Sequence, residues 1–163
     1  MAKIFVPLGT QKFPFKRLII ALNNLVEKGI YRPEDIVMQS TIYDIKPIFT
    51  HVELIPLDEF NQYIQEAELV ITHAGVNSII SCMQKDKALL IVPRLYKYKE
   101  HVDNHQVEIA QLMEQKYNML VLYDISSLEE MIQKAKVHKY KKWESHKASF
   151  CLLYTSPSPR DTR

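Results

Sequence analysis

Residues 69–92, LVITHAGVNSIISCMQKDKALLIV, decide the fold because they place one helix between two strands. Leu69–Ile71 is apolar on both faces, which is typical of a buried strand in a parallel sheet. After a THAG turn, a helix is expected from about Val76 to Lys85, and Ala88–Val92 then repeats the apolar strand pattern until Pro93 ends it. This order of elements predicts parallel strands with the helix packed against their sheet.

The same alternation of strand and helix continues on both sides of this segment. Ile4–Val6 is a short apolar run, and apolar residues then recur at helical spacing from Phe15 to Val26, with Pro14 suited to the first turn and Gly29 to the end. We therefore expect an α/β fold, with one parallel sheet covered by helices on both faces. Further strands are expected at 35–39, 51–57 and 119–122, and further helices at 58–67, 103–117 and from 127 onwards.

Capping residues predict where three of these helices begin. Asp58 is placed to cap the helix that follows it. Asp103 with Gln106, and Ser127 with Glu130, resemble capping boxes, in which two side chains satisfy the free amides of the first turn.

Length and composition favour a single domain in a reducing compartment. The chain of 163 residues, 47% of them hydrophobic, is long enough for one compact core and too short for two. A formal charge of +2 gives no reason to expect binding to nucleic acid. Cys82 and Cys151 cannot form a disulfide framework and lack neighbours at metal-ligand spacing, so a cytoplasmic location is expected.

The last residues differ abruptly from the rest. Residues 151–163, CLLYTSPSPRDTR, break from the lysine-rich pattern before them and resemble a translated sequencing adapter more than a protein segment. We therefore assign the domain to residues 1–150 and expect the tail to be non-native. Since no segment approaches the roughly 18 apolar residues of a membrane span, any membrane contact is expected to be peripheral or through a partner.

Two loops after predicted strands are candidates for ligand binding. Gly9 and Gly75 each follow a strand and precede a helix, where the backbone amides of a parallel sheet converge. The loop Gly9-Thr10-Gln11 and the loop His73-Ala74-Gly75 with Ser78 together have the groups to hold a diphosphate, although both also fit ordinary tight turns. Neither carries a dinucleotide fingerprint or a P-loop, which weighs against a dehydrogenase and a nucleotide triphosphatase.

Three segments, taken together, resemble a known family. PLGTQKFPFKRLI at 7–19, THAGVNSII at 72–80 and PRLYKYKEHVDNHQVEIA at 93–110 are similar to the C-terminal domain of glycosyltransferase family 28, and the resemblance covers about residues 1–135. The resemblance implies the Rossmann-like C-terminal half of a GT-B glycosyltransferase. It also implies a UDP-sugar donor, inversion at the anomeric carbon, and no metal or other cofactor.

The resemblance places the donor-binding residues in three loops. It implies that Gly9 and its neighbours face the donor phosphates, that the loop at His73 is a second donor loop, and that Glu100 and the residues after it lie near the sugar. Amides and helix N-termini can stabilise a leaving diphosphate where no metal does. The general base is expected on an acceptor domain that this chain lacks. The full set is Gly9, Thr10, Gln11, His73, Ala74, Gly75, Asn77, Ser78, Glu100, His101, Asp103, Asn104 and Gln106.

Several histidines and phenylalanines near these loops have a second interpretation. His101, Asp103 and His105 superficially suggest a metal site, but zinc is not expected because the HExxH order and a third ligand are missing. His73 alone would be read as a turn histidine, and the resemblance favours the donor loop instead. Phe15 begins an apolar helix stripe and is expected in the core, whereas stacking of Phe13 on a uracil stays open.

Two basic segments have open roles. Residues 94–99, RLYKYK, form either a solvated loop or a contact with a diphosphate-linked lipid acceptor or a partner subunit. The lysines between Lys134 and Lys147 form either a solvated helix face or a surface that rests on an anionic membrane or a membrane-anchored partner.

By resemblance, the expected function is that of one half of an enzyme. The chain would be the donor-binding, catalytic subunit of a two-component inverting hexosyltransferase that moves a sugar from UDP to a lipid-linked saccharide acceptor in exopolysaccharide or capsule synthesis. A membrane-anchored acceptor-domain subunit would hold it at the inner face of the membrane. The donor sugars of the family include galactose, glucuronic acid and GlcNAc. The alternative is a non-catalytic nucleotide-sugar-binding or enhancer subunit of a full-length transferase.

Overall fold

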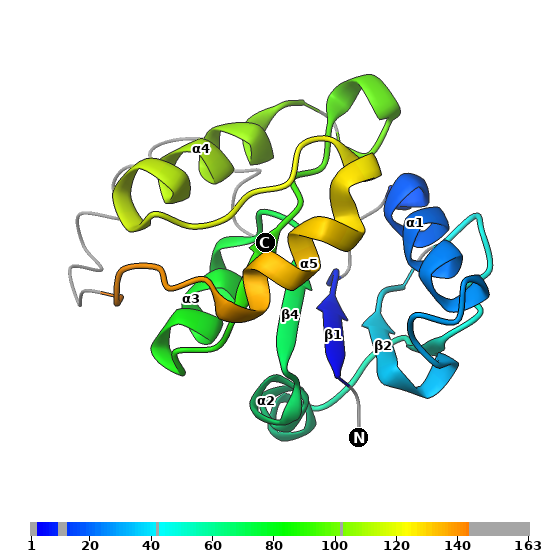
Figure 1. The fold of residues 1–163 in the computed structure, drawn as a ribbon. Helices are drawn as coiled ribbons and strands as arrows, with labels where there is room; N and C mark the ends of the chain where they lie inside the picture. The colour runs from blue at the N-terminus through cyan, green and yellow to red at the C-terminus, as the bar shows by residue number, and fades with distance from the viewer. Residues whose placement is uncertain (1–2, 10–12, 42, 102, 144–163) are drawn as a thin grey trace.

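The computed structural model describes residues 3–9, 13–41, 43–101 and 103–143, and in these residues strands and helices alternate (Figure 1). The strands are β1 (Ile4–Pro7), β2 (Ile36–Gln39), β3 (Thr50–Val52), β4 (Leu69–Thr72) and β5 (Leu89–Ile91). The α-helices are α1 (Lys16–Glu27), α2 (Leu57–Glu66), α3 (Val76–Gln84), α4 (His105–Tyr117) and α5 (Leu128–Val137). Short 3-10 helices are η1 (Pro33–Asp35), η2 (Tyr96–Tyr98) and η3 (Ile125–Ser127).

Within the described residues, five parallel strands form one sheet in the order β3-β2-β1-β4-β5. The chain runs outwards from β1 to β3, then returns to the other side of β1 and runs outwards again. Ile4 in β1 therefore pairs with Ile36 on one side and with Leu69 on the other. The direction reverses between β1 and β4, and ligands of open parallel sheets bind beyond the strand ends at such a reversal. The predicted α/β fold is confirmed.

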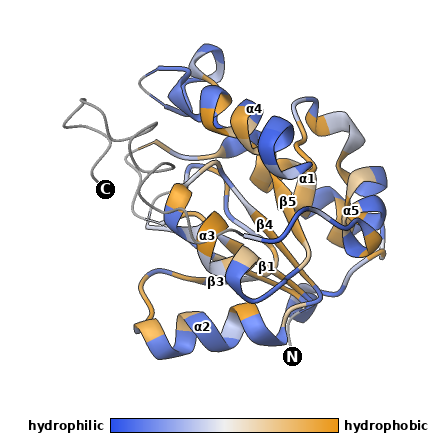
Figure 2. Ribbon diagram, turned by 90° about the vertical axis from the view of Figure 1, so that its left-hand side faces the viewer, coloured by the Kyte–Doolittle hydropathy of each residue, from blue (hydrophilic) through white to orange (hydrophobic). Residues whose placement is uncertain are grey.

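Helices cover both faces of the sheet (Figure 1). Successive strand residues point to opposite faces, so Ile4 and Val6 join the core under α1 and α5, while Phe5 joins the core under α2, α3 and α4. Every residue of β1, β2, β4 and β5 is buried between these two layers of helices. The strands are accordingly hydrophobic and the outer helix surfaces mostly hydrophilic (Figure 2). Phe15, expected in the core, is buried there.

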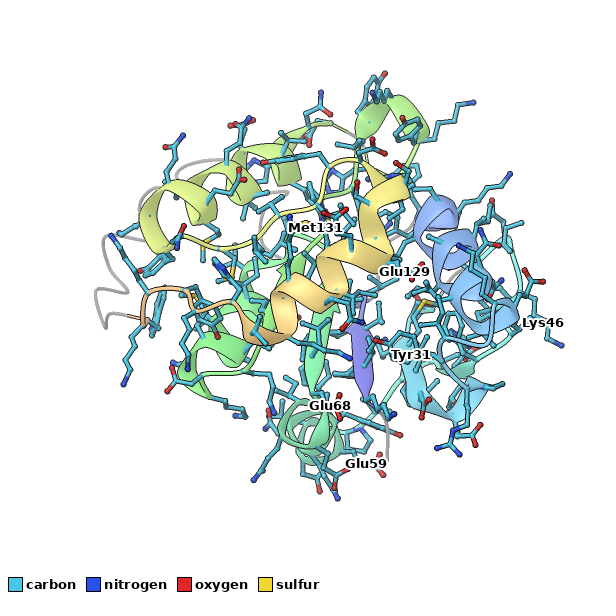
Figure 3. All side chains as sticks on the ribbon, in the orientation of Figure 1. Tyr31, Lys46, Glu59, Glu68, Glu129 and Met131 are labelled. Carbon is cyan, nitrogen blue, oxygen red and sulfur yellow. The ribbon has the colours of Figure 1, made fainter. Side chains whose placement is uncertain are left out.

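Helix α5 lies over the sheet beside α1 and the segment that follows it (Figure 3). Met131 packs against the core cluster of this face. The Lys28 ammonium lies 3.9 Å from the Glu129 carboxylate, and the Lys136 ammonium lies 5.3 Å from the centre of the Tyr31 ring. Because exposed ion pairs contribute only about 0–1 kcal/mol, apolar burial holds α5 in place.

Three helices end on a residue with positive φ. After α1, Gly29 has φ 79°, and the amides of Gly29 and Ile30 donate to the carbonyls of Val26 and Leu25, which is a Schellman motif. Asp86, with φ 51°, follows the C-cap of α3 in the same way, and Asn118, with φ 57°, is the C-cap of α4. The predicted stop at Gly29 is confirmed.

Two predicted strands are shorter than expected. The strand predicted at 51–57 spans only Thr50–Val52, because its partner β2 ends opposite Val52 and Pro56 lacks an amide to continue the ladder. Residues 119–122 lie beside β5 where a further parallel strand would, but they make a single bridge, between Val121 and Ile91. The amide of Leu122 donates to the carbonyl of Ile91 at 2.8 Å.

The predicted capping residues were wrong in detail. Helix α2 begins at Leu57 with Pro56 as its N-cap, so Asp58 lies inside the first turn. Helix α4 begins at His105 with Asn104 as N-cap in place of Asp103. Helix α5 has the predicted N-cap, Ser127, but neither N-cap side chain accepts a hydrogen bond from its helix. For α4, tertiary hydrogen bonds of Gln106, described below, override the local pattern.

Candidate donor-binding site

Three loops meet at the carboxyl edge of the sheet around its switch point. They follow β1, β4 and β5, which are neighbours in the sheet. The Thr72 hydroxyl at the end of β4 donates to the Pro7 carbonyl at the end of β1 at 3.2 Å. This bond holds the starts of the first two loops next to each other. This is the edge where the sequence places the candidate residues.

The first loop is fixed by Gln39 at the end of β2. Gly9 has φ 71°, a conformation that favours glycine, and its amide donates to Gln39 Oε1 at 2.9 Å. Gln39 Nε2 donates back to the Gly9 carbonyl at 3.3 Å and to the Glu53 carbonyl at 2.6 Å. Gln39 therefore positions Gly9 from a neighbouring strand. Thr10 and Gln11 lie outside the described residues.

The second loop turns tightly into α3. His73 and Ala74 are buried, and Gly75 is the N-cap of α3. The amide of Gly75 donates to the His73 carbonyl at 2.7 Å, which folds the loop back on itself. A Cβ on Gly75 would stand only 3.1 Å from His73 Cε1 and 3.2 Å from Nε2, so the ring lies over the glycine. Asn77 is exposed and Ser78 half-buried in the first turn of α3.

Gln106 joins the second loop to the third. The amide of Arg94, just after β5, donates to Gln106 Oε1 at 2.9 Å, and Gln106 Nε2 lies 2.8 Å from His73 Nδ1. All three residues are buried. These bonds account for the failed capping box at α4, because Gln106 is committed to partners outside its helix.

The Arg94 guanidinium reaches the first loop as well. Its Nη1 donates to the Phe13 carbonyl at 2.7 Å and to the Glu100 carbonyl at 3.1 Å, and the group lies 4.8 Å from the centre of the Phe15 ring. Burial lowers the pKa of Arg94 to about 10, and the arginine remains charged at neutral pH. Arg94, grouped by its sequence with the basic loop at 94–99, is only 2% exposed and contacts all three loops directly or through Gln106. Tyr96 and Tyr98 of the same loop are exposed, which fits either role left open for it.

Glu100 anchors the third loop to α1. Its carboxylate accepts from Arg17 Nε at 2.8 Å and from the Leu95 amide at 2.9 Å. Burial raises the pKa of Glu100, and the bonds from Leu95 and Arg17 oppose that shift. Arg17 also donates to the Pro93 carbonyl at 2.9 Å. Both oxygens of Glu100 are thus engaged within the protein.

The remaining candidates lie at the start of α4. Asp103 Oδ1 accepts from the His105 amide at 2.9 Å and lies 3.2 Å from His101 Nδ1. Although burial acts to raise it, the pKa of Asp103 is lowered by the His105 amide and by His101. Asn104 is exposed, and its Oδ1 accepts from the Tyr96 amide at 3.2 Å. Among the described residues, no group of three His, Cys, Asp or Glu is arranged to hold a metal ion.

The structure therefore brings most candidates to one edge but gives them different roles. The described candidates of the first two loops stand at the ends of β1 and β4, whereas Glu100 and Gln106 are buried and bound to other protein groups. The sequence reasoning missed Arg17, Gln39 and the burial of Arg94. The local signal for Arg17 was an arginine in the first turn of an apolar helix. Its partner Glu100, the partner Gly9 of Gln39, and the contact of Arg94 with Phe13 are all distant in sequence.

Two other features lie outside this edge. A hollow of about 590 Å³ at the opposite end of β5 is lined by Asp86, Ala88, Lys136, Val137, His138, Lys139, Tyr140 and Lys142. It lies at the amino end of β5, whereas the candidate loops lie at the carboxyl edge of the sheet, and no candidate residue lines it. Across the described part of the chain, no helix combines the length and apolarity needed to cross a bilayer.

A parallel sheet of this order, with loops joined at its switch point, defines a Rossmann-like domain. The model of the glycosyltransferase family 28 C-terminal domain matches residues 4–153. The chain therefore belongs to the glycosyltransferase family 28 C-terminal domain family, as its motifs predict.

Two relatives agree with this assignment. The UDP-N-acetylglucosamine transferase subunit ALG13 of Candida albicans (strain SC5314 / ATCC MYA-2876) is 39% identical over 72 residues, which are 44% of this chain and 23% of that protein. The chain thus matches less than a quarter of that relative's length. An NMR solution structure of ALG13 superposes with a TM-score of 0.56 and 18% identity over 94% of both chains, which supports the fold.

Proposed function

We propose that this chain is the donor-binding, catalytic subunit of a two-component inverting glycosyltransferase whose donor is a UDP-sugar. The observation that carries the proposal is the path from Arg94 through Gln106 to His73, which holds three loops together at the switch point of a family 28 domain. Polar groups fixed in this way need little reorganisation when a ligand binds. Hydrogen-bond donors that are already in position stabilise a negative charge that develops during a reaction.

The proposed chemistry at this edge is departure of UDP from the sugar. Charge develops on the diphosphate as the glycosidic bond breaks. The free amides at the N-terminus of α3 and the positive end of its dipole favour such a charge. Two cations stand at these loops: Arg17 donates to the Glu100 carboxylate, and Arg94 donates to the Glu100 backbone carbonyl. We propose that their charge adds positive potential at this edge. No metal is needed in this proposal.

The acceptor half is proposed to come from a second polypeptide. The matched family model is that of a C-terminal domain, and the active site of such a transferase lies between two domains. We propose a membrane-anchored partner that presents a lipid-linked saccharide in exopolysaccharide or capsule synthesis, with this chain at the inner face of the membrane. Because the ALG13 relative is named for N-acetylglucosamine transfer, UDP-GlcNAc is the first donor to test, before UDP-galactose and UDP-glucuronic acid.

The donor site is tested by ligand-dependent melting of the full chain with UDP, these UDP-sugars and GDP. A ligand at a hundred times its dissociation constant adds about 2.7 kcal/mol, or about 5–10 °C for a domain of this size. We expect a UDP-selective shift that His73→Ala reduces by about half or more. His138→Ala is the matched control, because His138 lies at the opposite edge of the sheet and its ring, like that of His73, has a hydrogen-bond partner within the protein, the Asn118 carbonyl.

Catalysis is tested on the complex with the partner. His73→Ala should abolish sugar transfer while the complex still forms on size exclusion. Two results together would favour the non-catalytic subunit instead. A full-length partner enzyme would transfer sugar without the donor loops of this chain, and the complex with His73→Ala would keep its full activity. Failure of every nucleotide to bind, to the chain and to the complex alike, would refute the donor site itself.

A further inference from the structure

The orientation of the Gln106 amide determines which nitrogen of His73 carries a proton. The backbone amide of Arg94 can only donate, so the Gln106 atom 2.9 Å from it is the oxygen. The other end of the amide is then the nitrogen, which lies 2.8 Å from His73 Nδ1 and can also only donate. Nδ1 must therefore accept and bear no proton, which leaves the proton of the neutral ring on Nε2.

Burial keeps this arrangement from reversing. Gln106 is 4% exposed, His73 6% and Arg94 2%, so water cannot easily replace a lost partner. A proton on Nδ1 would set two donors against each other at 2.8 Å. A flip of the amide would set Gln106 Nε2 against the Arg94 amide. Each alternative leaves buried donors without an acceptor, which is unfavourable.

We propose that Gln106 is a positioning residue that fixes His73 as the neutral Nε2–H tautomer. His73 is then a hydrogen-bond donor and not a base, because Nδ1 is engaged and Nε2 is protonated. The Nε2 atom lies 3.2 Å from the position of a Cβ on Gly75, at the start of α3, where free helix amides also converge. The choice of a diphosphate as the group that receives this bond rests on the proposed function, whereas the tautomer does not.

The tautomer is measured directly by long-range ¹H–¹⁵N correlation spectra of the full chain, with the His73 signals assigned by their loss in His73→Ala. We expect a pyridine-like Nδ1 and a pyrrole-like Nε2 in the unmodified protein. Gln106→Glu keeps the shape of the side chain and its acceptor for the Arg94 amide, but it presents a second acceptor to His73. In this variant we expect a proton on Nδ1.

Gln111→Glu is the matched control, because it adds the same charge on an exposed position of the same helix. It should leave the His73 spectrum unchanged. A pyrrole-like Nδ1 in the unmodified protein would overturn the proposal, and that measurement needs no variant to fold. An unchanged His73 spectrum in a folded Gln106→Glu chain would overturn it as well.

Calorimetric titration with UDP tests the consequence for the ligand. We expect Gln106→Glu and His73→Ala each to weaken binding about ten- to hundred-fold, the range for a lost charge-assisted hydrogen bond, and the double variant to be no weaker than His73→Ala. Undiminished binding by Gln106→Glu with a reversed tautomer would refute the role of Nε2 as donor. If the unmodified protein and its complex bind no UDP, the proposed function fails, but the tautomer result stands.

Discussion

At the scale of single residues, the lack of a side chain at Gly75 lets the His73 ring lie over the start of α3. The backbone there has φ −92°, which alanine adopts freely, so the constraint is contact with the ring and not backbone strain. We expect Gly75→Ala to destabilise the fold by about 1 kcal/mol, because overpacking costs about 1–3 kcal/mol and the stiffer unfolded chain returns about 0.4–1 kcal/mol. Urea unfolding measures the change.

A double-mutant cycle separates the ring contact from other causes. In a His73→Ala background, Gly75→Ala should cost nothing or be slightly stabilising, because the ring that its Cβ would meet is gone. An equal cost in both backgrounds would show that the glycine is required for some other reason.

At the scale of elements, two helices end on non-glycine residues with positive φ. Asp86 and Asn118 adopt at the ends of α3 and α4 the left-handed conformation that Gly29 adopts after α1. We expect Asp86→Gly and Asn118→Gly each to raise the free energy of unfolding by about 0.5–1 kcal/mol, since glycine adopts positive φ without steric cost. Thermal unfolding gives the result, and Asp86→Ala and Asn118→Ala, which keep the steric cost, should not stabilise the protein.

The elements also show what could be predicted from the sequence. The central strands were predictable because short apolar runs bounded by turn residues, such as Leu69–Ile71, are typical of buried strands. Their order was not, because pairing of Ile4 with Leu69 depends on the whole topology. The capping box at Asp103 failed because Gln106 forms tertiary hydrogen bonds that no local pattern reports.

The candidate site, too, could be predicted from the sequence only in part. Gly9 and His73 were predictable from their places between strand and helix and from the family motifs. The burial of Arg94 was not, because an arginine among exposed lysines and tyrosines has the pattern of a solvated loop. Its contacts with Phe13 and Phe15, about 80 residues earlier in the chain, stabilise it there.

At the scale of the whole molecule, the bonds that join the three loops predict a shared response to the donor. Because Arg94 contacts both Phe13 and Glu100, and reaches His73 through Gln106, ordering one loop restrains the others. We expect UDP to slow amide hydrogen exchange in all three loops together and to leave α2 and the end of α5 unchanged. Mass-spectrometric hydrogen exchange with and without UDP tests this. Protection confined to a single loop would contradict the coupling.

The short margins of the sheet restrict how this protein can assemble with others. On one side the outermost strand, β3, has three residues, and on the other side residues 119–122 meet β5 through one bridge. Long unpaired strands are templates for the addition of a foreign strand and for aggregation. In the described part of the chain, neither margin offers such a template. We therefore expect the proposed companion chain to recognise side chains on loops and helices, which would make the association sensitive to single substitutions.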